Sequence, residues 1–260
     1  MGFKIIHGNS QKLWVPVTYE DTLYVGQIVK CQANEGAAPF GAASGAVDTT
    51  GKSIPFGVVV GTNNRIPLFN ATYNTQYITD ATPLASTTEF TGVEGPWSKG
   101  EQRAMVEVEL ITPETILRGQ LFNAAFGTAM TVGTTTAGDS VSCTTGTLVA
   151  STANQATIYF RTGTNKGAYR ILDNTSATAQ TWDTPTYIAV AVGDKCVKAP
   201  LRCIGPSYVD FDAESMYVEA SATYGTNYHV IDVIRLDLSV AGQEYVDFKF
   251  NIDHFAQARA

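Results

Sequence analysis

The sequence predicts an all-β protein with very little helix. About one residue in eight is threonine, 23 of the 260 residues are glycine, and only 16% are charged. Threonine favours strands and glycine favours turns, and this low charge argues against a coiled coil, a helical bundle or a disordered chain. Hydrophobic residues make up 44% of the chain, enough for a substantial core. We expect a β-barrel or β-sandwich core formed by N- and C-terminal strands, with a smaller inserted β domain.

The first quarter of the chain contains three strand-like segments. Residues 13–17 and 23–30 are apolar and predict a strand pair. Pro16 limits the first of these strands to a sheet edge or a strand end, because proline has no N–H to donate. Residues 35–52 are rich in alanine, glycine and threonine and are interpreted as a loop. The apolar run 56–61, bounded by glycines, is typical of a strand buried on both faces.

The next stretch of the chain consists of a long loop followed by one clear strand. Residues 63–100 are polar and interrupted by prolines, and one strand is expected near 76–78. In residues 104–110, valines alternate with Glu107 and Glu109, which is the period of a half-exposed strand. These two glutamates are therefore interpreted as solvent-facing strand residues and not as an acid–base pair.

A short helix is expected at residues 112–119. Thr112 would cap its N-terminus, Pro113 would occupy the first helical position, and Glu114 would lie in the first turn. Gly119 would end the helix after less than two turns.

The region between residues 130 and 205 has the pattern of a small barrel or sandwich. Short strands separated by turn sequences are expected at 156–161, 167–172, 177–182 and 195–201. This spacing of about 8–12 residues is typical of small β domains. We therefore predict an inserted barrel-like domain at 130–205, and a main β domain made of 1–129 and 206–260.

Two alternating segments near the C-terminus predict a β-hairpin with one buried face. The expected inward residues are Ile234, Leu236, Leu238, Val246, Phe248, Phe250 and Ile252. A turn at 241–243 would join the strands. So regular a terminal strand is expected to close the sheet that the N-terminal third begins.

The net charge of −7 argues against a protein that binds nucleic acid by neutralising phosphates. The segment 1–7 lacks the apolar region and cleavage site of a signal peptide, so the chain is expected to act without its own export. No apolar run approaches the roughly 18–20 residues of a membrane span, so no membrane partner is expected.

The segment 46–53 resembles a phosphate-binding P-loop, with Ala46 in place of its first glycine. A P-loop follows a buried strand and opens a helix, whereas here a small-residue loop precedes it and Pro55 follows. We interpret it as a loop turn without bound nucleotide.

The candidate metal ligands lack the spacing of known sites. His7, His229 and His254 form no metal-binding motif, and each is interpreted as a structural residue. In an extended strand the carboxylates of Asp210, Asp212 and Glu214 would share one face, which could hold Ca²⁺, but the EF-hand glycine is absent. They are interpreted as a solvated strand edge or a first helical turn. We expect no catalytic residue, no cofactor and no metal.

The four cysteines are interpreted as reduced thiols packed as small hydrophobic residues. They are Cys31, Cys143, Cys196 and Cys203, and none forms a Cys-x-x-Cys pair. A disulfide framework would need the secreted context that the N-terminus does not indicate.

As an acidic β protein rich in threonine and glycine, the chain resembles the structural proteins of tailed-phage virions, most closely capsid decoration or cement proteins. The segments that carry this resemblance are 26–30, 56–61, 163–178 and 191–196. The resemblance implies a β-barrel or sandwich without catalytic residues, assembled in the host cytoplasm and attached to the capsid surface. Its expected partners are the major capsid protein and further copies of itself. The weakly charged segments 33–55 and 63–100 would serve as arms lying against a partner.

Three alternatives remain. The chain could be another virion component, such as a tail tube, connector, fibre module or shell protein, although no long shell-protein spine helix is predicted. A glycan-binding β module is also possible, with Trp97, Trp182 and Tyr187 as sugar-stacking candidates. An enzyme is the least supported alternative, since no catalytic signature is present.

Overall fold

The structure is a computed structural model of the whole chain. It describes residues 2–8, 11–16, 22–32, 36–40, 54–62, 77–79, 105–122, 130–137, 140–145, 157–173, 179–182, 190–211, 216–220 and 229–252. These residues form strands and turns and contain no helix, so the prediction of an all-β fold is confirmed. The P-loop-like segment 46–53 and most of 63–100 lie outside the described residues.

The chain divides into two compact units. The first unit comprises Met1–Leu117, Asp212–Met216 and Ile252–Ala260, and the second comprises Arg118–Phe211 and Tyr217–Asn251. All strands of one closed barrel lie within the 130–205 range of the predicted inserted domain. The strands of the C-terminal hairpin, however, belong to the same unit as that barrel.

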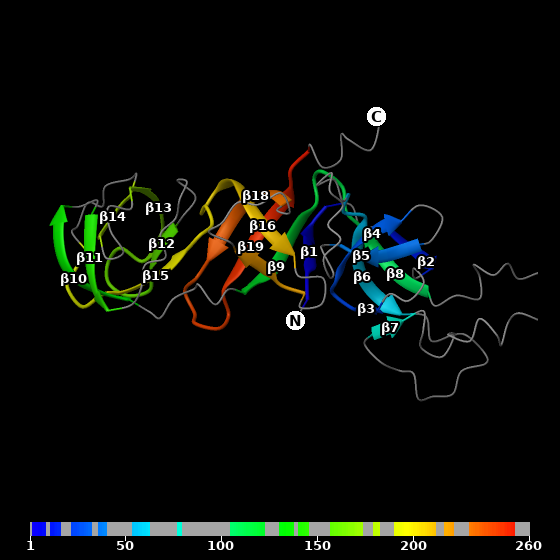
Figure 1. The fold of residues 1–260 in the computed structure, drawn as a ribbon, viewed down its shortest axis with the longest axis horizontal. Helices are drawn as coiled ribbons and strands as arrows, with labels where there is room; N and C mark the ends of the chain where they lie inside the picture. The colour runs from blue at the N-terminus through cyan, green and yellow to red at the C-terminus, as the bar shows by residue number, and fades with distance from the viewer. Residues whose placement is uncertain are drawn as a thin grey trace, which may run out of the picture. The chain divides into compact units, whose positions relative to one another are not determined.

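The first unit is built on a five-stranded antiparallel sheet (Figure 1). In spatial order its strands are β2 (Lys12–Pro16), β8 (Met105–Leu110), β6 (Gly57–Thr62), β4 (Ile28–Gln32) and β5 (Gly36–Pro39). Strand β1 (Lys4–His7) precedes it in sequence, and β3 (Thr22–Tyr24) and β7 (Tyr77–Thr79) form a separate antiparallel pair. The predicted strands at 56–61, 76–78 and 104–110 therefore correspond to β6, β7 and β8.

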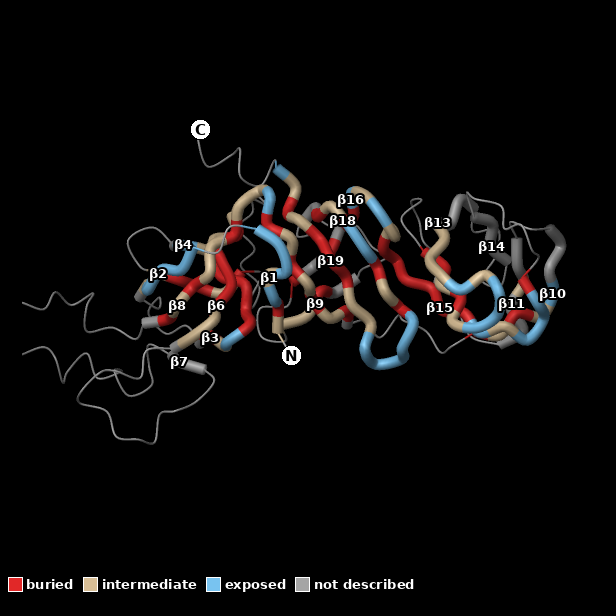
Figure 2. Tube along the Cα trace, turned by 180° about the vertical axis from the view of Figure 1, so that it is seen from behind, coloured by how far each residue is buried: buried red, intermediate tan, exposed pale blue. Residues whose placement is uncertain are grey.

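One face of this sheet carries the core of the first unit. Its fully buried members are Leu23, Val29, Ala37, Val59, Val106 and Val108. Val106 and Val108 are buried, whereas Glu107 and Glu109, which alternate with them, are half-buried, as predicted for β8. Figure 2 shows the resulting run of buried backbone along β6 and β8.

The single strand expected at 23–30 is wrong, because the chain turns inside it. Gly26 has φ of +89°, and its backbone approaches Gly2 so closely that a side chain on either glycine would overlap the other. The buried Gln27 accepts a hydrogen bond from the Tyr24 N–H through Oε1, at 2.9 Å. This turn separates β3 from β4, and β2 pairs with β8 instead of with its sequence neighbour.

Strand β5 was not expected, since it lies at the start of the predicted loop 35–52. Its small side chains carry no period, but Ala37 and Ala38 are buried and the strand pairs with β4. Tertiary pairing thus decides the conformation of a segment whose own composition favours a loop.

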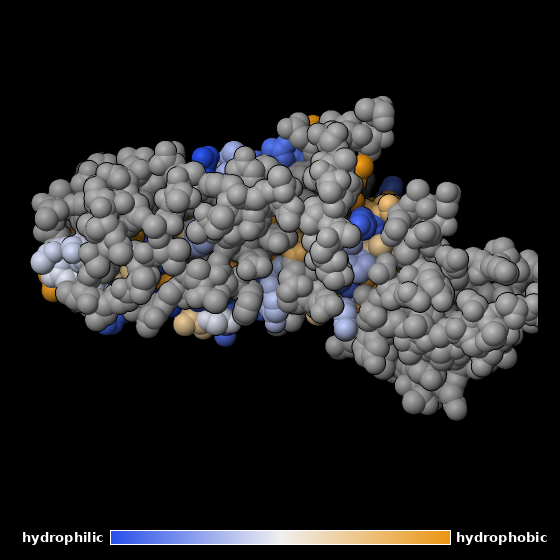
Figure 3. Space-filling model, viewed as in Figure 1, coloured by the Kyte–Doolittle hydropathy of each residue, from blue (hydrophilic) through white to orange (hydrophobic). Residues whose placement is uncertain are grey.

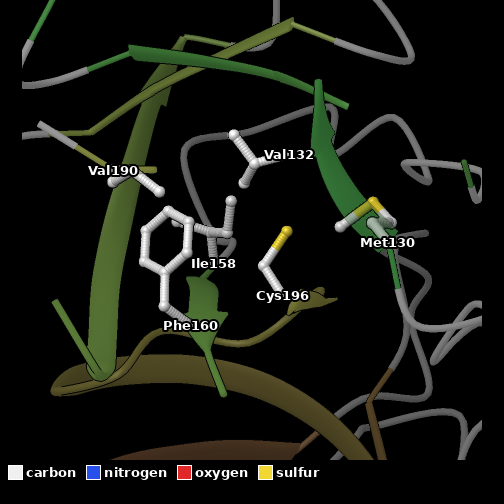
Figure 4. Close-up of a cluster of buried hydrophobic side chains, with 6 residues drawn as sticks. All are labelled: Met130, Val132, Ile158, Phe160, Val190 and Cys196. Carbon is white, nitrogen blue, oxygen red and sulfur yellow. The ribbon is translucent and has the colours of Figure 1, made fainter. Parts of the chain in front are cut away.

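The second unit contains a closed barrel of six antiparallel strands. In order around the barrel they are β10 (Met130–Ala137), β11 (Ser140–Thr145), β14 (Ala179–Trp182), β13 (Gly167–Asp173), β12 (Thr157–Phe160) and β15 (Lys195–Ala199). Figure 4 shows the buried cluster Met130, Val132, Ile158, Phe160, Val190 and Cys196. The four strands expected between 156 and 201 are all present, whereas β10 and β11 arise from a threonine-rich stretch in which no strand was identified.

The remaining strands of the second unit form what we call the hairpin sheet. They are β9 (Ile116–Phe122), β17 (Val218–Ala220), β16 (Gly205–Phe211), β18 (His229–Asp237) and β19 (Tyr245–Phe250), in that order, and β9 also pairs with β19. The rings of Phe211, Phe248 and Phe250 pack together with centroids 5.4–5.7 Å apart.

The helix predicted at 112–119 is wrong, because this segment is a turn followed by β9. The N–H of Thr115 donates to the carbonyl of Thr112 at 2.9 Å, closing a turn with Pro113 at its second position. Leu117, Gly119 and Leu121 are buried and alternate with half-buried residues, which is the period of a strand. Burial on alternate positions outweighs the helix-start pattern.

The predicted C-terminal hairpin is confirmed, since β18 and β19 pair in antiparallel register. The predicted inward face is wrong at two positions, because Ile234 is 41% and Ile252 65% exposed. The ladder between β18 and β19 is irregular between Val233 and Arg235. As a result, the next buried residue after Val233 is Leu236, three positions later, instead of position 235. Such a bulge inserts one residue and reverses the face on which the following side chains lie.

Candidate functional site

The most extensive polar cluster among the described residues lies on the hairpin sheet. Arg118 of β9 donates from Nε to Oδ1 of Asp247 at 2.7 Å and from Nη2 to Oδ2 at 2.8 Å. This bidentate geometry is the strongest form of arginine–carboxylate pairing. Alternation along β19 predicted a solvent-facing Asp247, but Asp247 is only 4% exposed. Arginine pairing makes this burial tolerable.

Tyr245 joins this ion pair to a second one. The Arg118 guanidinium lies 4.2 Å from the Tyr245 ring centroid, and the Arg235 guanidinium lies 5.7 Å from it. The Tyr245 hydroxyl and Nη2 of Arg235 donate to Oδ2 of Asp237 at 3.1 and 3.0 Å. Ser239 donates to the other oxygen of Asp237 through its N–H and its hydroxyl.

These contacts stabilise the ordinary charge states of the cluster. The hydrogen bond to Asp247 raises the pKa of Arg118. Burial alone would raise the pKa of Asp237, but hydrogen bonds from Ser239, Tyr245 and Arg235 outweigh burial and lower it. Burial, followed by the contact with Asp237, raises the pKa of Tyr245. At neutral pH the cluster therefore presents charged guanidiniums and a neutral phenol, which are groups that bind and position.

The cluster has its positive charge on the outside. The side chains of Arg118 and Arg235 are 41% and 59% exposed, whereas those of Asp247 and Asp237 are 6% and 17% exposed. Although the two pairs are neutral in total, a molecule approaching this surface meets the guanidiniums first.

A third ion pair holds the turn of the hairpin against the end of the barrel. Nε of Arg161 donates to the carbonyl of Leu238, and its Nη2 donates to Oε1 of Glu244, both at 2.7 Å. Both side chains are 13% exposed. The carbonyl of Glu244 also accepts from the N–H of Leu121 at 2.9 Å. The hairpin is thus held at its turn from two directions.

Large apolar side chains are exposed in both units. They are Ile6, Leu13, Trp14, Val25, Val192, Ile204, Ile234, Val240 and Ile252. In Figure 3, hydrophobic residues of the described part reach the visible surface beside hydrophilic ones. Leu13 and Trp14 are neighbours in β2 and are each about half exposed. Adjacent strand residues point to opposite faces, so β2 presents an apolar side chain on each face.

One buried lysine lies in the barrel. Lys198 of β15 is 4% exposed and stands directly opposite Ile158, a member of the barrel core. Burial lowers the pKa of Lys198 to about 8. Nothing in the local sequence of Lys198 distinguishes it from a surface lysine, so its burial could not be predicted from the sequence.

The residues weighed as metal ligands are not brought together among the described residues. His7 is exposed in β1, and His229 and Asp210 lie in β18 and β16 without described side chains. His254, Asp212 and Glu214 lie outside the described residues, as do Trp97 and Tyr187 and the side chain of Trp182. The part of the chain that the structure describes holds no group of three potential metal-ligating side chains.

The interpretation of the cysteines is correct for one residue and wrong for another. Cys196 is buried in the barrel core, but Cys31 is exposed on β4, so it does not pack as a hydrophobic residue. Cys203 is half-buried, and the side chain of Cys143 is outside the described part. The three described cysteines are free thiols.

No family model, curated protein or solved structure matches this chain. Within the described residues there is no helix long and apolar enough to span a bilayer.

Proposed function

We propose that this protein is a structural component of a tailed-phage virion that binds and stabilises the capsid lattice as a decoration or cement protein. Its partners would be the major capsid protein and further copies of itself, on the capsid surface. The observation that carries the proposal is Trp14 of β2, which is 49% exposed and, as the neighbour of the core-packed Val15, lies on the face of the strand away from the core.

Strand β2 has the composition of a protein-binding surface. It is an edge strand of its sheet, and Val15, the residue after Trp14, packs against the core of the first unit. Lys12 and Glu107 lie beside Trp14, with Nζ and Oε2 4.0 Å apart. A tryptophan on a fixed backbone with a polar rim is the common anatomy of an interface hot spot.

The charge of the chain supports attachment to the outside of a shell. A net charge of −7 disfavours contact with packaged DNA. With only 16% charged residues, the chain is suited to lying against another protein. A protein present in many copies on a lattice gains stability from contacts that a single copy lacks.

The test is binding of the full chain to purified shells of the phage that encodes it. We expect the protein to co-sediment with shells at saturable stoichiometry, and cryo-EM to place it on the outer capsid face. Density only on the tail would replace this proposal with another virion component. Retention on a glycan array without shell binding would favour the sugar-binding alternative.

The variant Trp14→Ala tests whether β2 is the contact surface. Loss of a tryptophan hot spot is expected to weaken shell binding about 10- to 30-fold without changing the thermal midpoint. Val192→Ala is the matched control, since Val192 is 69% exposed but lies in the other unit. Equal shell binding by wild type and Trp14→Ala would exclude β2 as the binding surface.

A further inference from the structure

We propose that the outer surface of the hairpin sheet is a docking site for an acidic protein segment. We call this surface, made of Arg118, Ile234, Arg235 and Tyr245, the arginine face. It belongs to the second unit and does not include β2, so it is a site additional to the one argued above.

The bulge in β18 creates this surface. In a regular strand, Ile234 and Arg235 would point to opposite faces of the sheet, so one of them would face the core and the other the solvent. The shift between Val233 and Arg235 leaves both exposed, Ile234 at 41% and the Arg235 side chain at 59%. Bulges of this kind commonly re-aim side chains at functional surfaces. An aliphatic group therefore lies next to a guanidinium in sequence and on the surface.

The arginines keep hydrogen-bonding capacity toward the outside. The bonds to Asp247 and Asp237 use Nε and Nη2 of Arg118 and Nη2 of Arg235. A guanidinium has five N–H donors, so each side chain retains donors for a second carboxylate. The native carboxylates lie beneath, 6% and 17% exposed, so they hold the arginines in place without shielding their outer edges.

The arginine face is also pre-organised. Arg118 is held at both Asp247 oxygens and against the Tyr245 ring, and the hairpin turn is held by Arg161. Groups fixed before binding lose little conformational entropy on binding. Arginine and tyrosine are, with tryptophan, the residues most enriched at interface hot spots.

An acidic protein segment fits this surface better than a nucleic acid does. The chain as a whole carries a net charge of −7. For a long polyanion, repulsion by this net charge outweighs the local attraction of the two arginines. A short peptide segment brings few charges, and its aliphatic side chains would contact Ile234 and the Tyr245 ring. We therefore assign to the arginine face a partner segment in which carboxylate and aliphatic side chains alternate.

The experiment uses the full chain and two fluorescent seven-residue peptides, one alternating Glu with Leu and one alternating Lys with Leu. We expect the Glu–Leu peptide to bind, and its affinity to fall as salt is raised from about 50 to about 300 mM, because Debye screening weakens exposed charge pairs. Arg235→Gln is expected to weaken binding about five- to tenfold, and Ile234→Ser about threefold.

Lys166→Gln is the matched control, since it removes one positive charge from an exposed position in the barrel of the same unit. It is expected to change the affinity less than twofold. Unaltered thermal midpoints of Arg235→Gln and Ile234→Ser would separate a binding defect from a folding defect. Equal binding of the Lys–Leu peptide, equal binding by Arg235→Gln, or tighter binding of a single-stranded oligonucleotide would each overturn the proposal.

Discussion

The barrel and the hairpin sheet of the second unit bury apolar residues in different ways. The hairpin sheet places three phenylalanine rings in mutual contact and covers its other face with charged residues in bidentate or multiple hydrogen bonds. The barrel packs six side chains of unequal size, only one of them aromatic, and it buries the amine of Lys198 beside them. The hairpin sheet thus follows the usual separation of apolar and polar faces, whereas the barrel carries a polar group inside.

Because they bury apolar residues differently, the two regions are expected to be destabilised by different changes. In the hairpin sheet, large contiguous rings mean that one truncation opens one large cavity. In the barrel, burial disfavours the charged form of the Lys198 amine. The free energy of unfolding therefore depends on whether Lys198 is protonated, and hence on pH.

The largest effect is expected from Phe248→Ala in the hairpin sheet. Phe248 is fully buried and contacts both Phe211 and Phe250, so we expect a loss of about 4–5 kcal/mol in the free energy of unfolding. Phe160→Ala in the barrel is the matched substitution, with an expected loss of about 3 kcal/mol, because Phe160 contacts one other ring, that of Tyr169, and is otherwise packed among non-aromatic side chains. Urea unfolding of both variants measures the difference, and a larger loss for Phe160→Ala would reverse the comparison.

Lys198→Met is expected to stabilise the protein by about 1–3 kcal/mol at pH 7, since it removes a buried charge whose pKa is lowered to about 8. The folded protein binds fewer protons at Lys198 than the unfolded chain between pH 8 and the ordinary value of 10.5. Stability of the wild type should therefore rise with pH across that window, relative to Lys198→Met. Thermal unfolding from pH 7 to pH 10.5 measures this, and parallel profiles for the two proteins would contradict it.

The Arg118–Asp247 pair is expected to couple by about 1–2 kcal/mol. Asp247 is buried, but Arg118 is partly exposed and can turn to solvent when its partner is removed, which limits the loss. A double-mutant cycle with Arg118→Ala and Asp247→Ala isolates the coupling. Additive losses in the two variants would mean that the bidentate contact contributes nothing to stability.

The smallest effect is expected from Ile234→Ser. Because the bulge exposes Ile234, the stability change should remain within about 0.5 kcal/mol. Val233→Ser, at the neighbouring buried position, should cost about 2–4 kcal/mol by losing apolar burial and burying a hydroxyl. A comparable loss for the two substitutions would show that the bulge is absent in solution.

Regular alternation was the most informative signal in the sequence. It predicted β8 and the C-terminal hairpin, because a strand with one buried face repeats every two residues whatever it pairs with. Short apolar runs bounded by turns likewise predicted β6 and four barrel strands. The predictions failed at 112–119, where a helix-start pattern competes with strand burial, and in β5, β10 and β11, whose small or hydroxylated residues carry no hydrophobic period.

The polar cluster could not be predicted from the sequence. Arg118 and Asp247 are separated by 129 positions, and each looks locally like an exposed strand residue. The bulge after Val233 leaves no signature in composition, yet it allows Val233 and Leu236 both to face the core while Ile234 is exposed. The burial of Lys198 depends in the same way on its register with β12.

The amino-acid sequence was enough to predict that this chain is built of strands, where the most regular strands lie, and how little charge its surface can carry. These properties follow from residue type and local periodicity, which act within a few positions along the chain. The pairing of the strands, the position of the bulge that re-aims two side chains, and the burial of particular charges depend on the three-dimensional fold. Pairing and register bring together residues far apart in sequence, and a shift of one position reverses the face on which every following side chain lies.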